Sequence, residues 1–463
     1  MNFEPIFHRF SQAEPQVAGV GLVGAGQFGA TFMAQIRRMS GVRMVAICDQ
    51  NPQRAVETAL QVGFSADAVK FCTDLPTAQA CAAQGHLVVV ERTDWLVQLP
   101  LVAVLEATGD PQGAAATALS CIEAGRHVVL ATKEAEVVVG AELARRARER
   151  GVVVSPVDGD QPSLLIGLIE WARLLGLPVV AAGKASESDF VWEPATDQVS
   201  AWGRQAAAPH MRQHFVAPEG LELSAVLKAR ADLPFELTTV PDLCEMGIVA
   251  NHTGLMPDCS GLHAPLARTV ELPTIFCPRS EGGILSGEGR VDMFNCLRRP
   301  DELSFAGGVF VVIEAPDEET GRLFAAKGMP TSANGRYVLV HNPVHLLGAE
   351  AAMSILSSVK LQCSTGSRQV RPRVDLVAIT DRDLMAGEVL ALGVRHAIPG
   401  LNHRLEPARP LGDDSPLPYY MCVGARVRHT VPAGRLLLCS DVEIDRNSTL
   451  YRLRASQDQH FFG

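Results

Sequence analysis

Hydrophobic and polar residues along residues 17–156 form short apolar runs separated by longer segments with helical spacing. The apolar runs are rich in Val, Ile and Leu on both faces, which is typical of strands buried within a parallel sheet. The predicted strands are residues 17–23, 42–48, 101–107, 127–131 and 152–156. The predicted helices are a segment ending near Arg38 and residues 52–62, 113–124 and 140–150. This alternation predicts an α/β domain over residues 1–160.

Beyond residue 160 strands and helices no longer alternate regularly. The pattern predicts helices over residues 163–175 and 346–359, and strands over residues 179–182, 307–314 and 336–341. Residues 186–222 form a long polar stretch without a clear period. We therefore predict an α+β domain over residues 161–362.

The last hundred residues contain short segments punctuated by Gly and Pro. Residues 364–373 are polar and basic, which suits a linker. Residues 373–390 and 425–444 share one form: an alternating strand, a turn ending in Ala-Gly and an apolar strand. This repetition predicts a small β-rich domain over residues 363–463 built from two related halves.

Composition and charge narrow the class of protein. The 463 residues are 47% hydrophobic and 20% charged, which is typical of a globular chain of roughly two to four domains. A net charge of -10 without a long Lys/Arg run argues against a nucleic-acid partner. No apolar stretch reaches the roughly 18 residues needed to span a bilayer, and the N-terminus does not resemble a signal peptide. We expect no membrane partner.

The eleven cysteines are odd in number and contain no C-x-x-C pair. A disulfide framework or a zinc knuckle would show paired spacing, so free thiols in a reducing cytoplasm are expected.

A glycine motif carries the clearest chemistry. Gly24, Gly26 and Gly29 form G-x-G-x-x-G between the first predicted strand and its helix, and Gln27 and Phe28 within the motif are further candidate coenzyme ligands. Such glycines permit a tight turn, a close approach of backbone to pyrophosphate, and close packing of helix on strand. The amide groups of the helix N-terminus then face the anion. The motif predicts a Rossmann domain that binds a nicotinamide dinucleotide.

The preferred coenzyme stays open between NAD and NADP. Asp49 ends the second strand, where a carboxylate can bind the adenosine ribose hydroxyls and repel a 2′-phosphate. Arg54 follows in the next helix and could pair with such a phosphate. Thr108 and Gly109 end another strand and are expected beside the coenzyme, although a plain turn capped by Thr108 explains them equally well.

Several blocks resemble one oxidoreductase family. The chain is similar to the homoserine-dehydrogenase-like NAD(P)-dependent oxidoreductases, and more closely to the group that adds a C-terminal SAF domain and includes a 1-deoxy-xylulose 5-phosphate reductoisomerase-like enzyme. The matching blocks are GLVGAGQFGATFMAQ at 21–35, EATG at 106–109, HVVLATKEAEV at 127–137, DGDQPSL at 158–164, AAGK at 181–184, EMGIVANHTGL at 245–255, RSEGGIL at 279–285, HLLGAE at 345–350 and LMAGEVL at 384–390.

The resemblance implies more than the pattern does. It implies that residues 161–362 bind substrate and form a homodimer or higher homo-oligomer through their sheet. It also implies that residues 346–359 return to the Rossmann domain, and that the last domain is SAF-like. Two departures leave the substrate open: Glu187 and Asp189 stand where a phosphate-binding cation is expected, while Lys133 resembles the lysine of true homoserine dehydrogenases.

Proton exchange at a substrate hydroxyl needs a titratable group, and lysine serves when its pKa falls. Lys184 ends an apolar strand, so we expect its ammonium at the mouth of a cleft, with a solvated lysine as the alternative. Lys133 is the second candidate. Asp160 is a candidate catalytic carboxylate and Asp158 a candidate substrate ligand. Both acids could orient a substrate hydroxyl or pair with Lys184, although D-G-D-x-P is also an ordinary turn.

Glu245 and Asn251 are further candidate substrate ligands on a predicted helix, although Asn251 also suits a helix end before Gly254. The histidine pairs His210/His214 and His341/His345 have the spacing of metal ligands on a helix. Pro343 interrupts the second pair and the first lies in a polar loop, so no metal is expected.

Three functions fit these observations. The first is a dehydrogenase or reductase acting on a small polar hydroxy- or oxo-compound. The second is a reductoisomerase-like enzyme acting on a sugar phosphate. The third is a noncatalytic dinucleotide sensor.

Overall fold

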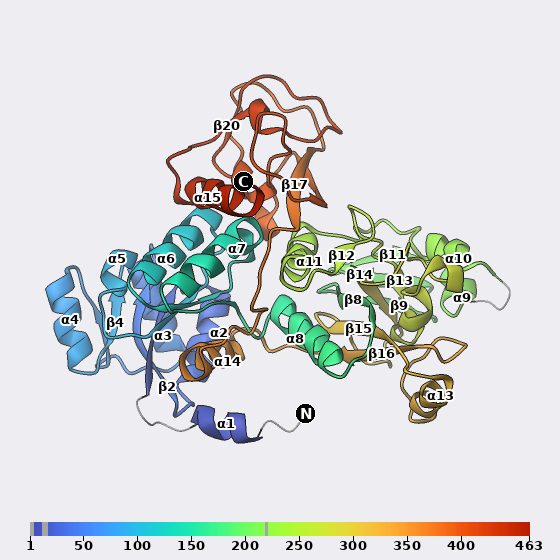
Figure 1. The fold of residues 1–463 in the computed structure, drawn as a ribbon, viewed down its shortest axis with the longest axis horizontal. Helices are drawn as coiled ribbons and strands as arrows, with labels where there is room; N and C mark the ends of the chain where they lie inside the picture. Colours follow the sequence, from blue (N-terminus) through green and yellow to red (C-terminus); the bar gives the residue numbers. More distant parts are fainter. Residues whose placement is uncertain (1–3, 12–16, 218–220) are drawn as a thin grey trace. The chain divides into compact units, whose positions relative to one another are not determined.

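The computed structural model describes residues 4–11, 17–217 and 221–463, which form two compact units (Figure 1). The first unit holds the N-terminal part of the chain to Ser163 together with residues 346–402 and 407–463. The second unit holds residues 164–345 and 403–406. The residues predicted as a small C-terminal domain thus lie almost entirely in the first unit.

The first unit is built on a seven-stranded parallel sheet in the order β3-β4-β2-β1-β5-β6-β7. Its strands are β1 (Ala18–Val23), β2 (Val42–Cys48), β3 (Val69–Phe71), β4 (Leu87–Val90), β5 (Ala103–Glu106), β6 (His127–Leu130) and β7 (Val154–Pro156). Every residue of β1, β4, β5 and β6 is buried, which explains their uninterrupted apolar runs. The strand order reverses between β1 and β5, where sheets of this type bind ligands.

One hydrophobic cluster joins strands of this sheet to α2 (Gln27–Ile36), α3 (Pro52–Gln61) and α14 (Ala351–Leu356). Phe32 from α2 and Ile355 from α14 both lie in this cluster and are fully buried. The prediction that residues 346–359 return to the N-terminal sheet is therefore confirmed. Only Ala351–Leu356 is α-helical, between the turn Leu347–Ala349 and the π-helical segment Ser357–Leu361.

A second helical layer consists of α6 (Pro111–Glu123), α7 (Lys133–Glu149) and α15 (Thr449–Phe462), which contact one another (Figure 1). The sequence pattern predicts α7 only from residue 140, which is wrong. The helix begins at Lys133 because the buried residues Glu134 and Glu136 stand in its first turn, where the helix dipole stabilises carboxylates.

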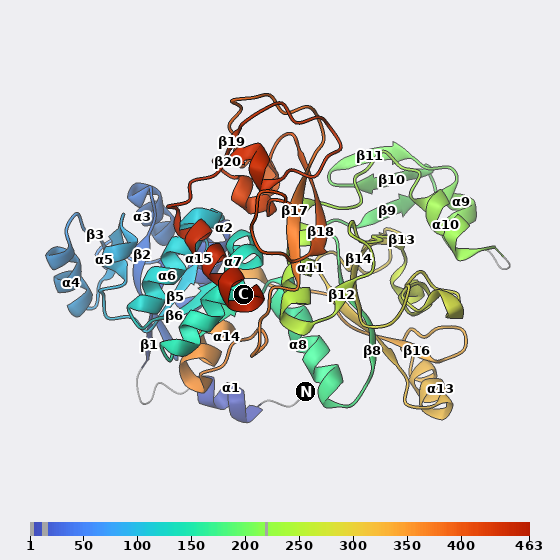
Figure 2. The same ribbon diagram turned by 45° about the horizontal axis from the view of Figure 1, so that its top comes forward.

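The two related C-terminal segments pair with each other. Antiparallel bridges join Ile379 to Leu436 and Leu384 to Val431, and Leu384 and Val431 exchange backbone hydrogen bonds of 2.9 and 3.0 Å. The same part of the chain contains β17 (Val374–Thr380), β19 (Arg426–Val427) and β20 (Val442–Glu443), with α15 beside them (Figure 2). The predicted internal repetition therefore corresponds to two mutually paired halves.

The segment 364–373 is attached to the first unit and is not a free linker. Thr365 donates its backbone N–H to Ser155 Oγ at 2.9 Å, and its hydroxyl lies 2.7 Å from that of Ser354. These short side chains satisfy polar groups at the end of β7, so the linker interpretation is wrong.

The second unit contains a mixed sheet of nine strands, with the order β11-β10-β9-β14-β8-β15-β16 and with β12 and β13 also paired to β14. Its strands are β8 (Val179–Ala185), β9 (Phe190–Glu193), β10 (Gln198–Ala201), β11 (Arg204–Ala207), β12 (Met256–Pro257), β13 (Leu266–Ala267), β14 (Arg290–Arg298), β15 (Val309–Glu314) and β16 (Tyr337–Asn342). The predicted polar stretch 186–222 holds three of these strands. Their shortness and partial exposure hide the alternation of Phe190, Trp192 and Val199 as buried positions.

Candidate functional site: the carboxyl edge of the parallel sheet

The three glycines of the G-x-G-x-x-G motif occupy three different environments. Gly24 has a φ of +95°, and a Cβ there would lie 2.4 Å from the carbonyl oxygen of Ala107. A Cβ on Gly29 would lie 2.4 Å from the carbonyl oxygen of Gly24, so this glycine allows α2 to pack on its own turn. At Gly26 a Cβ would meet only Arg54 Nη2, at 3.9 Å. Gly26 therefore borders open space.

The N-terminus of α2 faces that open space. Gly26 is its N-cap residue, and among the described residues no side chain caps the helix and no acid lies in its first turn. Gln27 is exposed, while Phe28 is half-buried and packs against the hydrophobic cluster below. Backbone amide groups left without a side-chain cap at a helix N-terminus are a site for an anion such as a pyrophosphate.

Asp49 at the end of β2 fixes the turn from the other side. Its Oδ2 accepts the N–H of Ala25 at 2.7 Å, and its Oδ1 accepts the N–H of Asn51 at 2.8 Å. The carboxylate thus ties the glycine turn to the β2–α3 loop and keeps oxygen lone pairs available for ribose hydroxyls.

A pocket of about 540 Å³ opens along this edge of the sheet. Asp49 and Arg54 both line it, so the carboxylate and the guanidinium that favour opposite coenzymes share one wall. The other lining residues come from the glycine turn, from the ends of β2, β4 and β5, and from α6 with its cap: Val23, Gly24, Gly26, Cys48, Gln50, Glu91, Thr93, Ala107, Thr108, Asp110, Gly113, Ala116, Thr117 and Ser120. The pocket therefore contains most of the predicted coenzyme ligands.

Glu106 at the end of β5 is fully buried behind this pocket. Its Oε1 accepts the backbone N–H of Thr108 at 2.8 Å and the hydroxyl of Thr108 at 2.6 Å. Burial raises the pKa of Glu106 to about 7, against these hydrogen bonds. The N–H and hydroxyl groups of Thr108 are therefore both bonded to Glu106. Gly109 donates its N–H to Thr132 Oγ1 at 3.0 Å.

Lys133 and Asp160 meet at the same edge of the first unit. Their Nζ–Oδ2 distance is 3.3 Å, and their side chains retain 23% and 13% exposure. Asp158 instead accepts a hydrogen bond from the Ser163 hydroxyl, and burial raises its pKa to about 6. The structure brings together a lysine and a carboxylate that remain partly accessible.

Lys184 lies in the second unit and is fully buried, so the expectation of a cleft mouth is wrong. Its register on β8 aligns it with Met293 of β14 and Val309 of β15, in the interior of the sheet. Its ammonium makes ion pairs with Asp242 Oδ1 at 2.7 Å and with Glu245 Oε2. Lys184 is thus neutralised by two buried carboxylates.

Both partners of Lys184 come from α11 (Val240–Thr253), which also holds the buried Asn251. Burial opposes ionisation of Asp242, but Lys184 and Thr239 hold the pKa of this carboxyl below its usual value. Sequence reasoning finds Glu245 and misses Asp242. The spacing of three residues, which places both acids on one helix face, is the signal that could have found it.

The histidine pairs do not form metal sites in the described part of the chain. His341 lies on β16 and not on a helix, and His345 Nδ1 lies 2.8 Å from the carbonyl oxygen of Gly307. His214 lies in the four-residue helix α9 (Met211–His214), which His210 precedes. Within residues 4–11, 17–217 and 221–463 no three His, Cys, Asp or Glu side chains are arranged to hold a metal ion.

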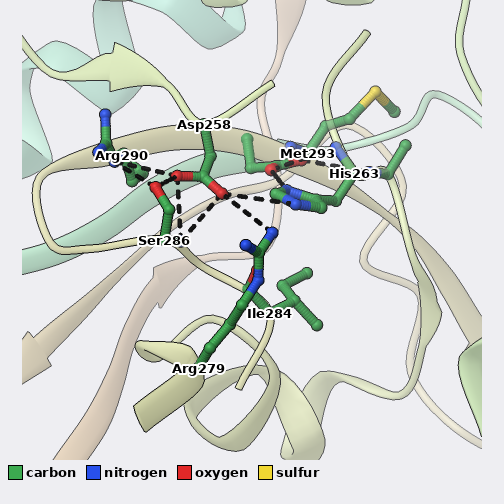
Figure 3. Close-up of polar contacts among 9 residues, drawn as sticks. Asp258, His263, Arg279, Ile284, Ser286, Arg290 and Met293 are labelled. Atoms are coloured by element: carbon green, nitrogen blue, oxygen red, sulfur yellow. Dashed lines mark hydrogen bonds and ion pairs between the residues drawn. The ribbon is translucent and has the colours of Figure 1, made fainter. Parts of the chain in front are cut away.

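A polar cluster centred on Asp258 occupies the second unit (Figure 3). The side chain of Asp258 is 1% exposed, and its carboxylate lies 3.1 Å from Arg290 Nε and accepts hydrogen bonds from Ser286. His263 Nδ1 lies 2.6 Å from the buried Asp292, whose carboxylate also accepts the N–H groups of His263 and Ala264. Because carboxylates lie near both of its ring nitrogens, we assign this histidine to the framework of the loop.

A family comparison matches the second unit. Residues 159–226 and 238–351 match the family model described as oxidoreductase DRL, catalytic domain. The central part of the chain resembles an oxidoreductase catalytic domain. The match covers less than half of the chain and leaves out the glycine turn and the pocket beside it.

Two curated relatives are described as 1-deoxy-D-xylulose 5-phosphate reductoisomerase. The relative from Anaeromyxobacter dehalogenans is 32% identical over 154 residues, which cover 33% of this chain and 34% of the relative. The relative from Anaeromyxobacter sp. strain K has the same identity and coverage. The chain thus matches about a third of the length of these relatives.

Solved structures resemble parts of the chain at low identity and with low TM-scores. An oxidoreductase from Bacillus subtilis is 13% identical, with 76% of this chain and 92% of that chain covered and a TM-score of 0.36. A dehydrogenase from Thermotoga maritima is 12% identical, with 74% and 89% covered and a TM-score of 0.36. Myo-inositol dehydrogenase from Lactobacillus casei, solved with NAD(H) and myo-inositol, is 18% identical, with 37% and 46% covered and a TM-score of 0.27. Similarity at this level gives no information about the substrate of this chain.

Two further observations concern the environment of the protein. In the part of the chain that the structure describes, no helix has the length and apolar character needed to cross a membrane. All eleven cysteines lie within the described residues as free thiols.

The glycine environments predict opposite effects of two alanine substitutions. Gly26→Ala should leave the thermal unfolding temperature almost unchanged, because its methyl group enters open space, and should weaken coenzyme binding at least tenfold. Gly29→Ala should lower the unfolding temperature, because its methyl group would overlap the Gly24 carbonyl. Calorimetric titration and thermal melts of both variants measure these effects. Unchanged affinity in a folded Gly26→Ala protein would contradict the placement of the pyrophosphate.

The raised pKa of Glu106 predicts that this carboxyl group lowers the stability of the folded protein at higher pH. Between about pH 4.5 and 7 the folded protein holds a proton on Glu106 that the unfolded chain has released, so this group costs stability as pH rises. Glu106→Gln should therefore raise the unfolding temperature at pH 8 and change it little at pH 5. Each pKa unit corresponds to about 1.4 kcal/mol. Glu123→Gln, at an exposed position on α6, is the control. An equal effect of Glu106→Gln at both pH values would contradict the prediction.

Proposed function

We propose that the chain is an NAD(P)-dependent oxidoreductase that transfers a hydride between nicotinamide and a small polar hydroxy- or oxo-compound. The observation that carries this proposal is the open glycine turn: Gly26 borders a pocket, the N-terminus of α2 has no side-chain cap, and Asp49 holds the turn in place. The match of the second unit to an oxidoreductase catalytic domain supports the same class of reaction.

The residues at the pocket fit a dinucleotide coenzyme. Asp49 and Arg54 lie where the adenosine ribose is expected, and the amide groups at Gln27 and Phe28 lie where the pyrophosphate is expected. The coenzyme, when bound, supplies or accepts the hydride. NAD and NADP both remain compatible with this wall, because it holds one carboxylate and one guanidinium.

Lys133 is our candidate for holding the reacting oxygen and exchanging its proton. It follows β6 at the carboxyl edge, is partly accessible, and has Asp160 as a carboxylate partner that can take up or return a proton. Lys184 serves in our proposal as a buried counter-charge for Asp242 and Glu245 of α11. Glu245 and Asn251, which the sequence suggests as substrate ligands, are both buried.

A second candidate is a reductoisomerase-like enzyme acting on a sugar phosphate, which the match to the two curated relatives favours. One side chain weighs against it. Asp189, at a position where a phosphate-binding cation is expected, is buried and lies 2.6 Å from Arg298 Nε. The guanidinium of Arg298 is therefore already paired with a carboxylate.

We also propose a cytoplasmic location and, from the family resemblance, a homodimer or higher homo-oligomer.

The proposed function is tested by incubating the protein with each coenzyme and with hydroxy acids, sugar acids, amino alcohols and sugar phosphates in turn. We expect a change in absorbance of the reduced nicotinamide with an unphosphorylated polar compound. Turnover of sugar phosphates alone would favour the reductoisomerase-like enzyme. Coenzyme binding without turnover of any compound would favour a dinucleotide sensor.

Once a substrate is known, substitutions of Lys133 and Lys184 should differ in their effects on turnover and stability. Lys133→Met should lower turnover by about 10² or more and leave the folded protein stable, because general acid–base groups contribute on that scale. Lys184→Met should cost about 3–5 kcal/mol of unfolding free energy, because it leaves two buried carboxylates without their cation. Turnover and denaturant melts measure both effects.

A matched variant controls for the buried charges. Adding Asp242→Asn and Glu245→Gln to Lys184→Met should recover much of the lost stability, because no buried charge then lacks a partner. A stable Lys184→Met protein with strongly reduced turnover would instead assign catalysis to Lys184.

A further inference from the structure

The C-terminal part of the chain places a histidine beside the proposed coenzyme site. His396 belongs to the short turn η5 (Val394–His396), which lies in the first unit together with the parallel sheet. The carbon Cε1 of its ring lies 3.0 Å from where a Cβ on Gly109 would be. Gly109 also has a φ of +70°, so both its backbone conformation and the imidazole favour glycine at the end of EATG.

A buried carboxylate lies beside this imidazole. His396 Nδ1 lies 2.9 Å from Glu134 Oε1 in the first turn of α7, and the Glu134 side chain is only 4% exposed. The imidazole side chain itself is 43% exposed. Nδ1 is the ring nitrogen that lies beside the carboxylate. Nε2 is the second nitrogen at which an imidazole can exchange a proton.

The backbone that carries His396 is strained. Arg395 and His396 have φ values of +53° and +59°, which non-glycine residues seldom adopt, least of all in succession. The loop is closed by a hydrogen bond of 2.7 Å from Gly393 N to the Ala397 carbonyl. The N–H of Ile398 donates to the buried Tyr419 hydroxyl at 2.7 Å. Strain that surrounding contacts maintain is typical of functional sites.

His396 lies on the side of the parallel sheet where we expect the nicotinamide half of a dinucleotide. Glu106 and Leu130 are paired at the ends of β5 and β6, so Gly109 and Glu134 follow neighbouring strands at the carboxyl edge. In a doubly wound sheet the two nucleotide halves lie on opposite sides of the point where strand order reverses. Asp49 marks the adenosine side on β2, and β5 and β6 therefore take the nicotinamide side.

We propose that His396 is a positioning residue for the nicotinamide half of the coenzyme, contributed by the C-terminal segment. This inference rests on the proposed function. The imidazole offers Nε2 to a polar group such as the nicotinamide carboxamide, while Glu134 fixes the ring. The SAF-like part of the chain thereby completes the coenzyme site.

The charges around His396 give this contact a pH dependence. The hydrogen bond to Glu134 raises the pKa of His396, against the effects of burial and of Lys133, whose own partner is Asp160. The neighbouring Asp110 is engaged as the cap of α6 through Gly113 N. The protonated imidazole therefore persists to higher pH than usual, and its donation from Nε2 is lost as pH rises through the folded pKa.

The inference is tested by calorimetric titration of the full chain with NADH or NADPH, whichever binds, and with ADP-ribose, which lacks the nicotinamide. His396→Asn suits the test, since asparagine tolerates positive φ. We expect the variant to bind the dinucleotide about tenfold more weakly below pH 7, with a smaller effect at pH 9, and to bind ADP-ribose as wild type does. Titration in two buffers of different ionisation enthalpy should also show less proton uptake by the variant.

Two controls separate positioning from general damage. His429→Asn removes a histidine that is 61% exposed and lies 3.1 Å from Asp441 in the same part of the chain, and should bind both ligands normally. Glu134→Gln should shift the pH dependence of dinucleotide binding to lower pH. Equal affinities of wild type and His396→Asn for the dinucleotide, or an equal loss for both ligands, would overturn the inference. Failure of the wild-type protein to bind any dinucleotide would instead overturn the proposed function.

Discussion

The proposed coenzyme site depends on how closely the backbone of residues 24–29 lies to its neighbours. The methyl group of an alanine could not be accommodated at Gly24 against Ala107 or at Gly29 against Gly24, whereas Gly26 borders open space. The hydrogen bond from Ala25 to Asp49 holds the turn in this shape. The backbone is tightly packed at Gly24 and Gly29 and open at Gly26, so the amide groups at the N-terminus of α2 face the pocket. A pyrophosphate needs this arrangement.

The titratable groups of the two units differ in how far they are exposed. In the first unit Lys133, Asp160 and His396 at the carboxyl edge keep part of their surface accessible. In the second unit Lys184 is enclosed with two carboxylates. A charge with no exposed surface supports the sheet around it, while a charge that keeps an accessible edge can exchange a proton with a ligand. This contrast is why we favour Lys133 over Lys184 for proton exchange.

The parallel sheet and the glycine turn were predictable because their signals are local. Strands buried on both faces appear as apolar runs, and G-x-G-x-x-G is contiguous with its strand and helix. The short strands β9 to β11 escaped prediction because they are partly exposed and only four residues long. The start of α7 was misplaced because buried glutamates interrupt its apolar pattern.

Contacts between distant parts of the chain could not be predicted. His396 lies more than 250 residues from Glu134 in the sequence, and neither carries a local motif. The pairing of Lys184 with Asp242 likewise depends on how α11 packs on the sheet, although the spacing of Asp242 and Glu245 hinted at a shared helix face.

We infer that this chain holds a nicotinamide dinucleotide at the glycine turn. Its most direct test is titration of the purified protein with NADH and NADPH, following the fluorescence of the reduced nicotinamide. We expect a saturable change with at least one of the two, at one coenzyme per chain, and competition by ADP-ribose. A folded protein that shows no saturable change with either coenzyme would contradict it.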